Sequence, residues 1–196
     1  MRRRRWWQHG IVVDRLVLVN GLPGSGKTTL ATALATELSA PLVAKDAMKE
    51  ALADAVPAAP TRALGAAVMG AAWSLVAAID GPVVFEAWWY RPRDLPFAEQ
   101  GWALCGHPPV VEVWCDVDPE LARHRYATRR RHRIHTDAAR LAESPQLWSA
   151  STDAAPLGLG PVVRVPTDGP VDVAVVARAV TAALSAGRGG PHGTQP

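Results

Sequence analysis

The sequence lacks the features of membrane proteins and of disulfide-stabilised secreted proteins. No run in its 196 residues approaches the roughly eighteen uninterrupted apolar residues that would span a bilayer. It contains only two cysteines, Cys105 and Cys115, and neither their spacing nor their apolar surroundings suit a metal site or a disulfide framework. We therefore expect a soluble cytoplasmic protein with two buried free thiols and no membrane partner.

Basic residues are scarce outside two short clusters. Arg2–Arg5 form one cluster, and six more arginines lie between residues 123 and 133. Without these ten, the chain has 11 basic residues against 18 acidic ones, although its formal net charge is +3. A nucleic-acid footprint would spread positive charge over a whole face, so we do not expect a nucleic-acid partner. Asp14 and Arg15 interrupt the apolar segment that an export signal needs, and residues 1–12 are predicted to be a disordered basic extension.

Short apolar segments alternate with helical patterns through the rest of the chain. Five segments have the composition of buried strands: residues 15–20, 41–45, 82–86, 109–115 and 161–165. A helical pattern follows each of them, with apolar residues at helical spacing over 61–79 and a last helix at 171–186. This alternation predicts an α/β fold in which a five-stranded parallel sheet lies between two layers of helices. We expect one domain at residues 13–186 and a disordered tail at 187–196.

A complete G-x-x-x-x-G-K-[ST] string follows the first predicted strand and leads into a helix-forming run. Backbone N–H groups of such a loop surround phosphate, while Lys27 reaches the outer phosphates and the Thr28 hydroxyl can bind Mg²⁺. We therefore expect ATP and Mg²⁺ at this loop. The predicted nucleotide-binding residues are Gly21, Gly24, Ser25, Gly26, Lys27, Thr28 and Thr29.

Other missing motifs narrow the class of phosphate-loop protein. The sequence has no N-K-x-D string, which a GTPase uses to read its base, and no LSGGQ signature, which a transporter ATPase carries. It is also too short for a ring-forming mechanical ATPase. The remaining compact class is the nucleotide-dependent kinases.

Asp46 follows the second predicted strand, nineteen residues after Lys27. The carboxyl ends of parallel strands open on one crevice, so Asp46 should face the phosphate loop. A kinase must position the acceptor hydroxyl and take its proton, and we assign this role to Asp46. The nearby Lys45 and Lys49 could keep it ionised or bind an anionic substrate group. Alternatively, Asp46 caps the helix that follows, and the two roles are compatible.

Glu86 ends the third predicted strand and, like Asp46 and Lys49, is a candidate substrate-binding residue. An acid at this place commonly faces the metal or the substrate, the alternative being a solvated strand end. Trp88, Trp89 and Arg91 follow on what we predict to be a loop over the same crevice. Aromatic rings beside arginines suit a flat or sugar-like acceptor with polar substituents, although one Trp is expected to pack in the core.

The arginine-rich stretch at residues 123–135 begins on a helix that Asp118 and Pro119 introduce. We expect Arg125 and Arg129 to share one helix face, and Arg131 to lie in the loop beyond. Together they would form a lid that closes over the transferring phosphoryl group and neutralises its charge. The alternatives are a solvated basic helix and an RNA-binding arm. His132 and His135 have an H-x-x-H spacing without a third ligand nearby, and we do not expect zinc.

Five segments carry a resemblance to a known family: GLPGSGKTTLATALA, KDAMKEAL, VVFEAWWYRPRD, CDVDPELARHRYATRRRHRIHTD and PVVRVPTDGPVD. Together they resemble the small P-loop kinases that are often filed as AAA-family ATPases. These kinases are related to chloramphenicol phosphotransferase, zeta toxins and the kinase domain of polynucleotide kinase. The resemblance implies a five-stranded parallel core, Mg-ATP as donor, Asp46 as base or hydroxyl orienter, and Arg125, Arg129 and Arg131 in the lid. The family's R-H-P-x-H turn occurs as residues 131–135, with Arg133 in place of the proline.

We expect an ATP-dependent phosphotransferase that uses Asp46, Lys27, Arg125, Arg129 and Arg131 in catalysis and phosphorylates a hydroxyl of a small molecule, such as an antibiotic or another metabolite. Two alternatives remain open. One is a polynucleotide 5′-hydroxyl kinase, and the other is a regulatory module that binds ATP without transferring its phosphate.

Overall fold

The computed structural model describes residues 13–57, 61–129, 132, 134–135 and 154–186, so both terminal segments expected to be disordered lie outside the described residues. The strands are β1 (Val13–Gly21), β2 (Leu42–Ala44), β3 (Gly81–Glu86), β4 (Val110–Asp116) and β5 (Val162–Pro166). The helices are α1 (Lys27–Glu37), α2 (Lys45–Ala55), α3 (Thr61–Ala77), α4 (Arg91–Leu104), α5 (Pro119–Thr128) and α8 (Val173–Ala186). In the described part, all five predicted strands are present within a few residues of their predicted bounds.

The five strands form one parallel sheet in the order β2-β3-β1-β4-β5. Strand β1 is central because it consists almost entirely of residues that tolerate burial on both faces. Its carboxyl end leads directly into the phosphate loop, and the ends of β3 and β4 lie beside it in register. The predicted α/β fold is confirmed, and the sheet brings the loops after β1, β2, β3 and β4 to one edge.

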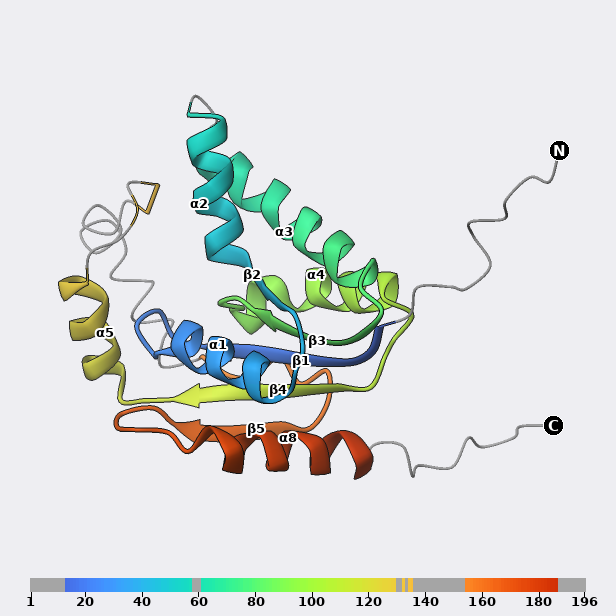
Figure 1. Cartoon of the computed structure of the whole chain (residues 1–196). Coiled ribbons are helices and arrows are strands. Elements are labelled where there is room, and N and C mark those ends of the chain that lie inside the picture. Colours follow the sequence, from blue (N-terminus) through green and yellow to red (C-terminus); the bar gives the residue numbers. More distant parts are fainter. Residues whose placement is uncertain (1–12, 58–60, 130–131, 133, 136–153, 187–196) are drawn as a thin grey trace, which may run out of the picture.

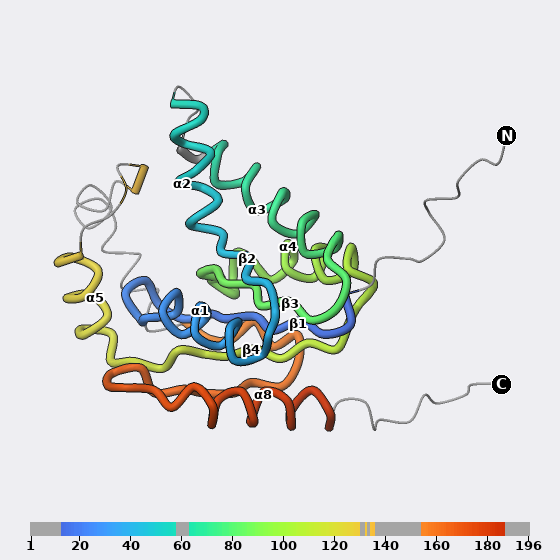
Figure 2. Tube along the Cα trace, in the orientation of Figure 1, coloured from blue at the N-terminus to red at the C-terminus, as the bar shows by residue number. Residues whose placement is uncertain are grey.

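Two helical layers cover the sheet, as Figures 1 and 2 show. On one face, alternate residues of β1 such as Leu16 and Leu18 join Trp73 of α3 and Ala98 of α4 in one buried cluster. On the other face, α1 and α8 pack on the remaining residues of the strands. Helix α2 projects beyond the edge of the sheet (Figure 1).

The two cysteines are free and buried, as the sequence predicts. Burial raises the pKa of Cys105 to about 11 and that of Cys115 to about 12. Both thiols are therefore protonated near neutral pH and act as core residues. None of the helices in the described ranges is long and apolar enough to cross a membrane.

Candidate functional site

The phosphate loop lies between β1 and α1 and has the backbone conformation that its glycines allow. Gly24 and Gly26 have φ angles of 85° and 84°, in the left-handed region that other residues rarely adopt. Gly26 is the N-cap of α1, and no side chain caps the helix there. The N–H groups of the first turn can therefore bind an anion, with the helix dipole in its favour.

The phosphate loop packs directly against α5. A β-carbon added to Gly24 would overlap the backbone carbonyl of Ala122. Helix α5 is itself fixed at its start, because the Asp118 side chain accepts hydrogen bonds from the N–H groups of Glu120 and Leu121 at 2.9 and 3.1 Å. The arginine-rich helix is thus anchored beside the loop that would hold the phosphates.

Glu86, at the end of β3, contacts both Lys27 and Thr28 at the end of the phosphate loop. Lys27 Nζ lies 3.9 Å from Glu86 Oε1, and the Thr28 hydroxyl donates to the same oxygen at 3.3 Å. Both charged side chains are buried, at 6% exposure for Lys27 and 1% for Glu86. Burial lowers the pKa of Lys27 and raises the pKa of Glu86, while the attraction between the two groups opposes both shifts. Glu86 is therefore a buried carboxylate and not a solvated strand end.

Asp46 lies in the first turn of α2, near this pair. Its charge acts on both partners: after burial and Lys27, it further raises the pKa of Glu86, and it also favours the charged form of Lys27. Its side chain is 35% exposed and pairs with Lys45 at 3.4 Å. The carboxyl edge of the sheet, which we call the crevice, therefore brings together the carboxylates and the lysine that the sequence assigned to it.

The alternative that Asp46 caps α2 is wrong. The N-cap is Ala44, and no side chain forms a cap hydrogen bond. Strand β2 runs into α2 without an intervening loop, so the helix begins at Lys45 and Asp46 already lies inside it. Lys49, one turn further along α2, is buried at 3% exposure.

Trp89 belongs to the core, which corrects its assignment to substrate binding. It is 2% exposed, and its ring meets that of Phe85 edge to face at 5.0 Å. Trp88 is only half-buried, with the Arg93 guanidinium 5.5 Å from its ring centroid. Side chains alternate across a strand and its extension, so only one of two adjacent tryptophans can face the crevice.

Arg91 starts α4, so the predicted loop over the crevice already ends at Tyr90. The Asp94 carboxylate accepts from the N–H of Tyr90 at 2.8 Å and stabilises this helix start, with Pro92 in the first turn. Arg91 is exposed, and its guanidinium lies beside Gly158. Its side chain is therefore accessible to solvent.

Arg125 holds a loop and does not lie free above the phosphate loop. Its guanidinium donates to the carbonyl oxygens of Thr167 and Asp168 at 2.7 and 2.8 Å. Together with the first turns of α1, these residues border an open groove of about 360 Å³. The groove is lined by Gly26, Thr29, Leu30, Ala33, Arg125, Thr167, Gly169, Val171 and Val173. The turn at Thr167–Gly169 was not predicted as part of the site, although its place after β5 at the same sheet edge could have indicated it.

Arg129 does not share a helix face with Arg125, because α5 ends at Thr128 and Arg129 has an extended backbone. Its guanidinium lies 5.5 Å from the ring of Tyr126, and its charge contributes to lowering the pKa of Lys27, after the larger effect of burial. Arg131 lies outside the described residues. The arginine lid therefore stays a prediction.

Residues beyond α5 contact α2. His132 Nε2 lies 3.1 Å from Asp54, and His135 Nε2 lies 2.8 Å from Glu50. In the part of the chain that the structure describes, no group of three or more potential metal ligands occurs. These two histidines therefore join the chain after α5 to the helix that carries Asp46.

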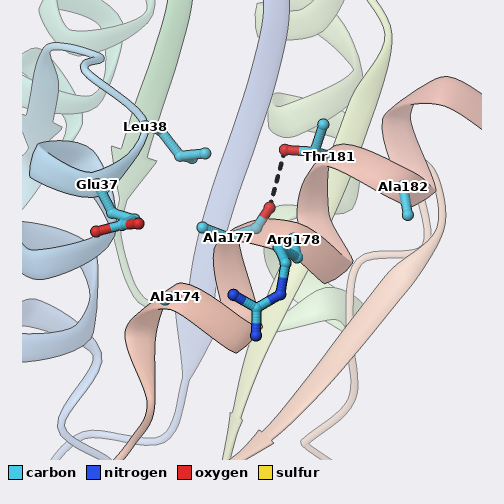
Figure 3. A pocket seen from close by; sticks show the side chains of 7 residues that line it. All are labelled: Glu37, Leu38, Ala174, Ala177, Arg178, Thr181 and Ala182. Atoms are coloured by element: carbon cyan, nitrogen blue, oxygen red, sulfur yellow. Dashed lines mark hydrogen bonds between the residues drawn. The ribbon is translucent and has the colours of Figure 1, made fainter.

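A second hollow, of about 440 Å³, lies between the end of α1 and α8 (Figure 3). Small side chains such as Ala174 and Ala182 form most of its wall, with Glu37 and Arg178 at its border. It contains neither the phosphate loop nor any residue near Asp46. We therefore regard the crevice, and not this hollow, as the functional site.

Comparison with known proteins agrees with this fold. The family model described as AAA domain matches residues 16–147, more than half of the chain. A candidate kinase from Chloroflexus aurantiacus j-10-fl is 23% identical, with a TM-score of 0.68 over 88% of this chain and 98% of that one. A gluconokinase from Sinorhizobium meliloti 1021 is 16% identical, with a TM-score of 0.55 over 89% and 94%.

A shikimate kinase from Bacteroides thetaiotaomicron is also similar. It is 18% identical, with a TM-score of 0.54 over 87% of this chain and 98% of that one. No match was found among the curated proteins. At these identities the similar structures establish the fold, which is that of small phosphate-loop proteins.

Proposed function

Because the chain belongs to the AAA domain family, and its crevice combines a phosphate loop with acidic groups, we propose that it is a kinase that transfers the γ-phosphate of ATP to a hydroxyl of a small molecule. One observation carries the proposal: the Asp46 carboxylate, in the first turn of α2, lies near enough to Lys27 and Glu86 for its charge to act on both. A protein that only binds nucleotide has no need of a carboxylate in this place. The names of the similar structures, gluconokinase and shikimate kinase among them, support a kinase.

The nucleotide would extend from the phosphate loop into the groove beside Arg125. The groove begins at Gly26 and Thr29, where the phosphate loop ends, and continues to the turn at Thr167–Gly169. Arg125 fixes this turn through two backbone carbonyl groups, which makes the groove a formed surface for a nucleoside. In this proposal Arg125 shapes the nucleotide site. Arg129, together with Arg131 of the predicted lid, neutralises the charge of the phosphates.

Thr28 and Glu86 fit a magnesium ion. Glu86 Oε2 is buried and has no hydrogen-bond partner among the described residues, and the Thr28 hydroxyl lies 3.3 Å from Glu86 Oε1. Carboxylate and hydroxyl oxygens are the ligands that Mg²⁺ prefers. When bound, Mg²⁺ would offset the charge of the outer phosphates.

In the proposed reaction, the acceptor oxygen forms a bond to the γ-phosphorus while the bond from that phosphorus to the β,γ-bridging oxygen breaks. Asp46 accepts the proton of the acceptor hydroxyl, since its carboxylate is the partly exposed one on the acceptor side. Lys27 and the N–H groups of the loop stabilise the charge on the phosphoryl oxygens. Trp88 and Arg91 would hold the acceptor, which we propose to be an alcohol such as an antibiotic or another hydroxylated metabolite.

The test is transfer of label from [γ-³²P]ATP, with Mg²⁺, to a panel of hydroxylated sugars, antibiotics and nucleosides, together with a 5′-hydroxyl oligonucleotide. We expect one class of small molecule to be labelled. Replacing Asp46 by Asn should lower transfer by about 10²–10⁴-fold, the usual contribution of a general base. Binding of Mg-ATP, measured by calorimetry, should persist in this variant.

Asp14→Asn is the matched control, because Asp14 is an exposed carboxylate in β1 at the opposite end of the strand from the crevice. It should transfer phosphate at the wild-type rate. Full transfer by Asp46→Asn would remove Asp46 as the base. Labelling of the oligonucleotide alone would favour the polynucleotide kinase, and tight ATP binding without any labelled acceptor would favour the regulatory module.

A further inference from the structure

Two buried polar residues, Asn20 and Glu112, form a hydrogen-bonded pair beside the phosphate loop. Asn20 lies on β1 and directly precedes Gly21, the first residue of the phosphate loop. Glu112 lies on the neighbouring strand β4. Both are 0% exposed. The Asn20 side-chain amide donates to Glu112 Oε1 at 2.9 Å. The proposed reaction does not use either side chain.

The Asn20 amide uses all of its hydrogen-bonding capacity. Its Nδ2 also donates to the Trp89 carbonyl oxygen at 3.2 Å. Its Oδ1 accepts from the N–H of Gly21 at 2.8 Å and from the N–H of Trp89 at 3.0 Å. One side chain therefore joins the first residue of the phosphate loop to the backbone of the loop after β3.

Glu112 connects a third segment to the same point. Its Oε1 accepts from the N–H of Leu157 at 3.0 Å, and its Oε2 accepts from the N–H of Gly158 at 3.2 Å. In the described ranges, no Lys, Arg or His forms an ion pair with Glu112. A buried carboxylate without a cation is costly, and an apolar pair of similar volume would suit the core as well. Core packing alone therefore does not explain why this position holds a polar pair.

The segments that meet at this pair border the donor and acceptor sides of the crevice. Gly21 begins the loop that would hold the phosphates, and Trp89 lies between Trp88 and the start of α4. Gly158 lies against the Arg91 guanidinium. A shift of any one segment would break hydrogen bonds that the others share.

We propose that Asn20 and Glu112 are positioning residues that fix the acceptor loop, residues 87–90, relative to the phosphate loop, so that binding of nucleotide also orders the acceptor loop. This inference rests on the proposed function, since it assigns the two loops to the acceptor and to the nucleotide. Near-attack geometry depends on such placement, because small displacements of the reacting groups slow transfer strongly.

The experiment measures amide hydrogen exchange of the full chain with and without Mg²⁺ and the non-hydrolysable analogue AMP-PNP. In the wild type, we expect the analogue to slow exchange in residues 21–28, and to slow it at least about fivefold in residues 87–90, a typical size for coupling between sites. Two near-isosteric variants then test the pair. N20D places an oxygen against Glu112 and the Trp89 carbonyl, and E112Q offers one acceptor to three N–H donors.

Both variants should keep the nucleotide-dependent protection of residues 21–28 and lose that of residues 87–90. The double variant N20D/E112Q should regain part of it, because the amide introduced at position 112 can donate to the carboxylate introduced at position 20. With an acceptor from the labelling panel, the single variants should show a lower ratio of phosphate transfer to ATP hydrolysis by water. Their KM for the acceptor should rise, while their affinity for nucleotide stays unchanged. Loss of stability alone would not produce this split.

The outcomes separate the two proposals. Absence of protection at residues 21–28 in the wild type would contradict nucleotide binding, and with it the proposed function. Protection at residues 21–28 without protection at 87–90 would overturn the coupling and leave the proposed function intact. This wild-type measurement decides the question even when the variants do not fold. Retained protection of residues 87–90 in both folded single variants would likewise overturn it.

Discussion

The donor side and the acceptor side of the crevice are built differently. On the donor side, the phosphate loop follows the central strand, and Lys27 and Glu86 are almost fully buried. On the acceptor side, the Asp46 side chain is 35% exposed, Trp88 is half-buried and Arg91 is exposed. These acceptor groups come from the first turns of α2 and α4 and from the short loop after β3.

This difference separates what is general from what is specific in the proposed reaction. Every kinase of this kind must hold the same phosphates, so its donor groups can be fixed by a buried sheet and a glycine-rich loop. The acceptor varies, and side chains at helix starts and loops can change without disturbing the core. The comparison predicts that donor-side changes abolish transfer to any acceptor, whereas acceptor-side changes at residues other than the proposed base, Asp46, alter which acceptor is used.

Among the changes that test this difference between the two sides, the largest effect is expected from Lys27→Met, which keeps the apolar stem and removes the ammonium group beside Glu86. Loss of one charge-stabilising group at the reacting phosphate lowers transfer by about 10²–10³-fold. The measurement is the rate of ATP turnover with acceptor and with water alone, and both should fall.

Lys45→Met is the acceptor-side counterpart, since Lys45 pairs with Asp46 at the start of α2. A partly exposed ion pair between neighbouring residues contributes little, so hydrolysis by water should stay within about threefold of the wild-type rate. Equal losses in the two variants would remove the distinction between the sides.

The next effect separates two adjacent tryptophans. Trp89→Ala removes a core ring packed on Phe85 and should lower the free energy of unfolding by about 3–5 kcal/mol. Trp88→Ala, at a half-buried position, should lower it by less than half of that value and raise the acceptor KM. Urea denaturation measures the first quantity and steady-state kinetics the second. A larger stability loss for Trp88→Ala would reverse the assignment.

The sequence predicted the donor side well because its chemistry is local. Eight consecutive residues, from Gly21 to Thr28, carry the loop conformation, the lysine and the hydroxyl, and the strand and helix on either side have clear patterns. Asp46 and Glu86 were also predicted, because each directly follows or ends a strand of a parallel sheet. One rule of topology was sufficient for these carboxylates.

The acceptor side and the arginine-rich region were predicted less well because they depend on helix ends and on contacts between distant segments. The register of α5 decides that Arg125 reaches Thr167, 42 residues away, and the end of the helix separates Arg129 from it. The choice between Trp88 and Trp89 depends on how the chain leaves β3. The pair of Asn20 and Glu112 gave no signal, since a single amide and a single acid in apolar strands have no recognisable spacing.

The smallest effect compares two glycines of the phosphate loop with nearly equal φ angles, Gly24 and Gly26. An Ala at Gly26 has open space, so it suffers only the left-handed backbone, at about 1–2 kcal/mol. An Ala at Gly24 has the same strain and also displaces the backbone of α5 at Ala122. Gly24→Ala should therefore lower the thermal midpoint more than Gly26→Ala, and it should weaken Mg-ATP binding as α5 moves from the loop. Equal midpoints for the two variants would show that α5 can shift without loss of stability and does not stabilise the phosphate loop.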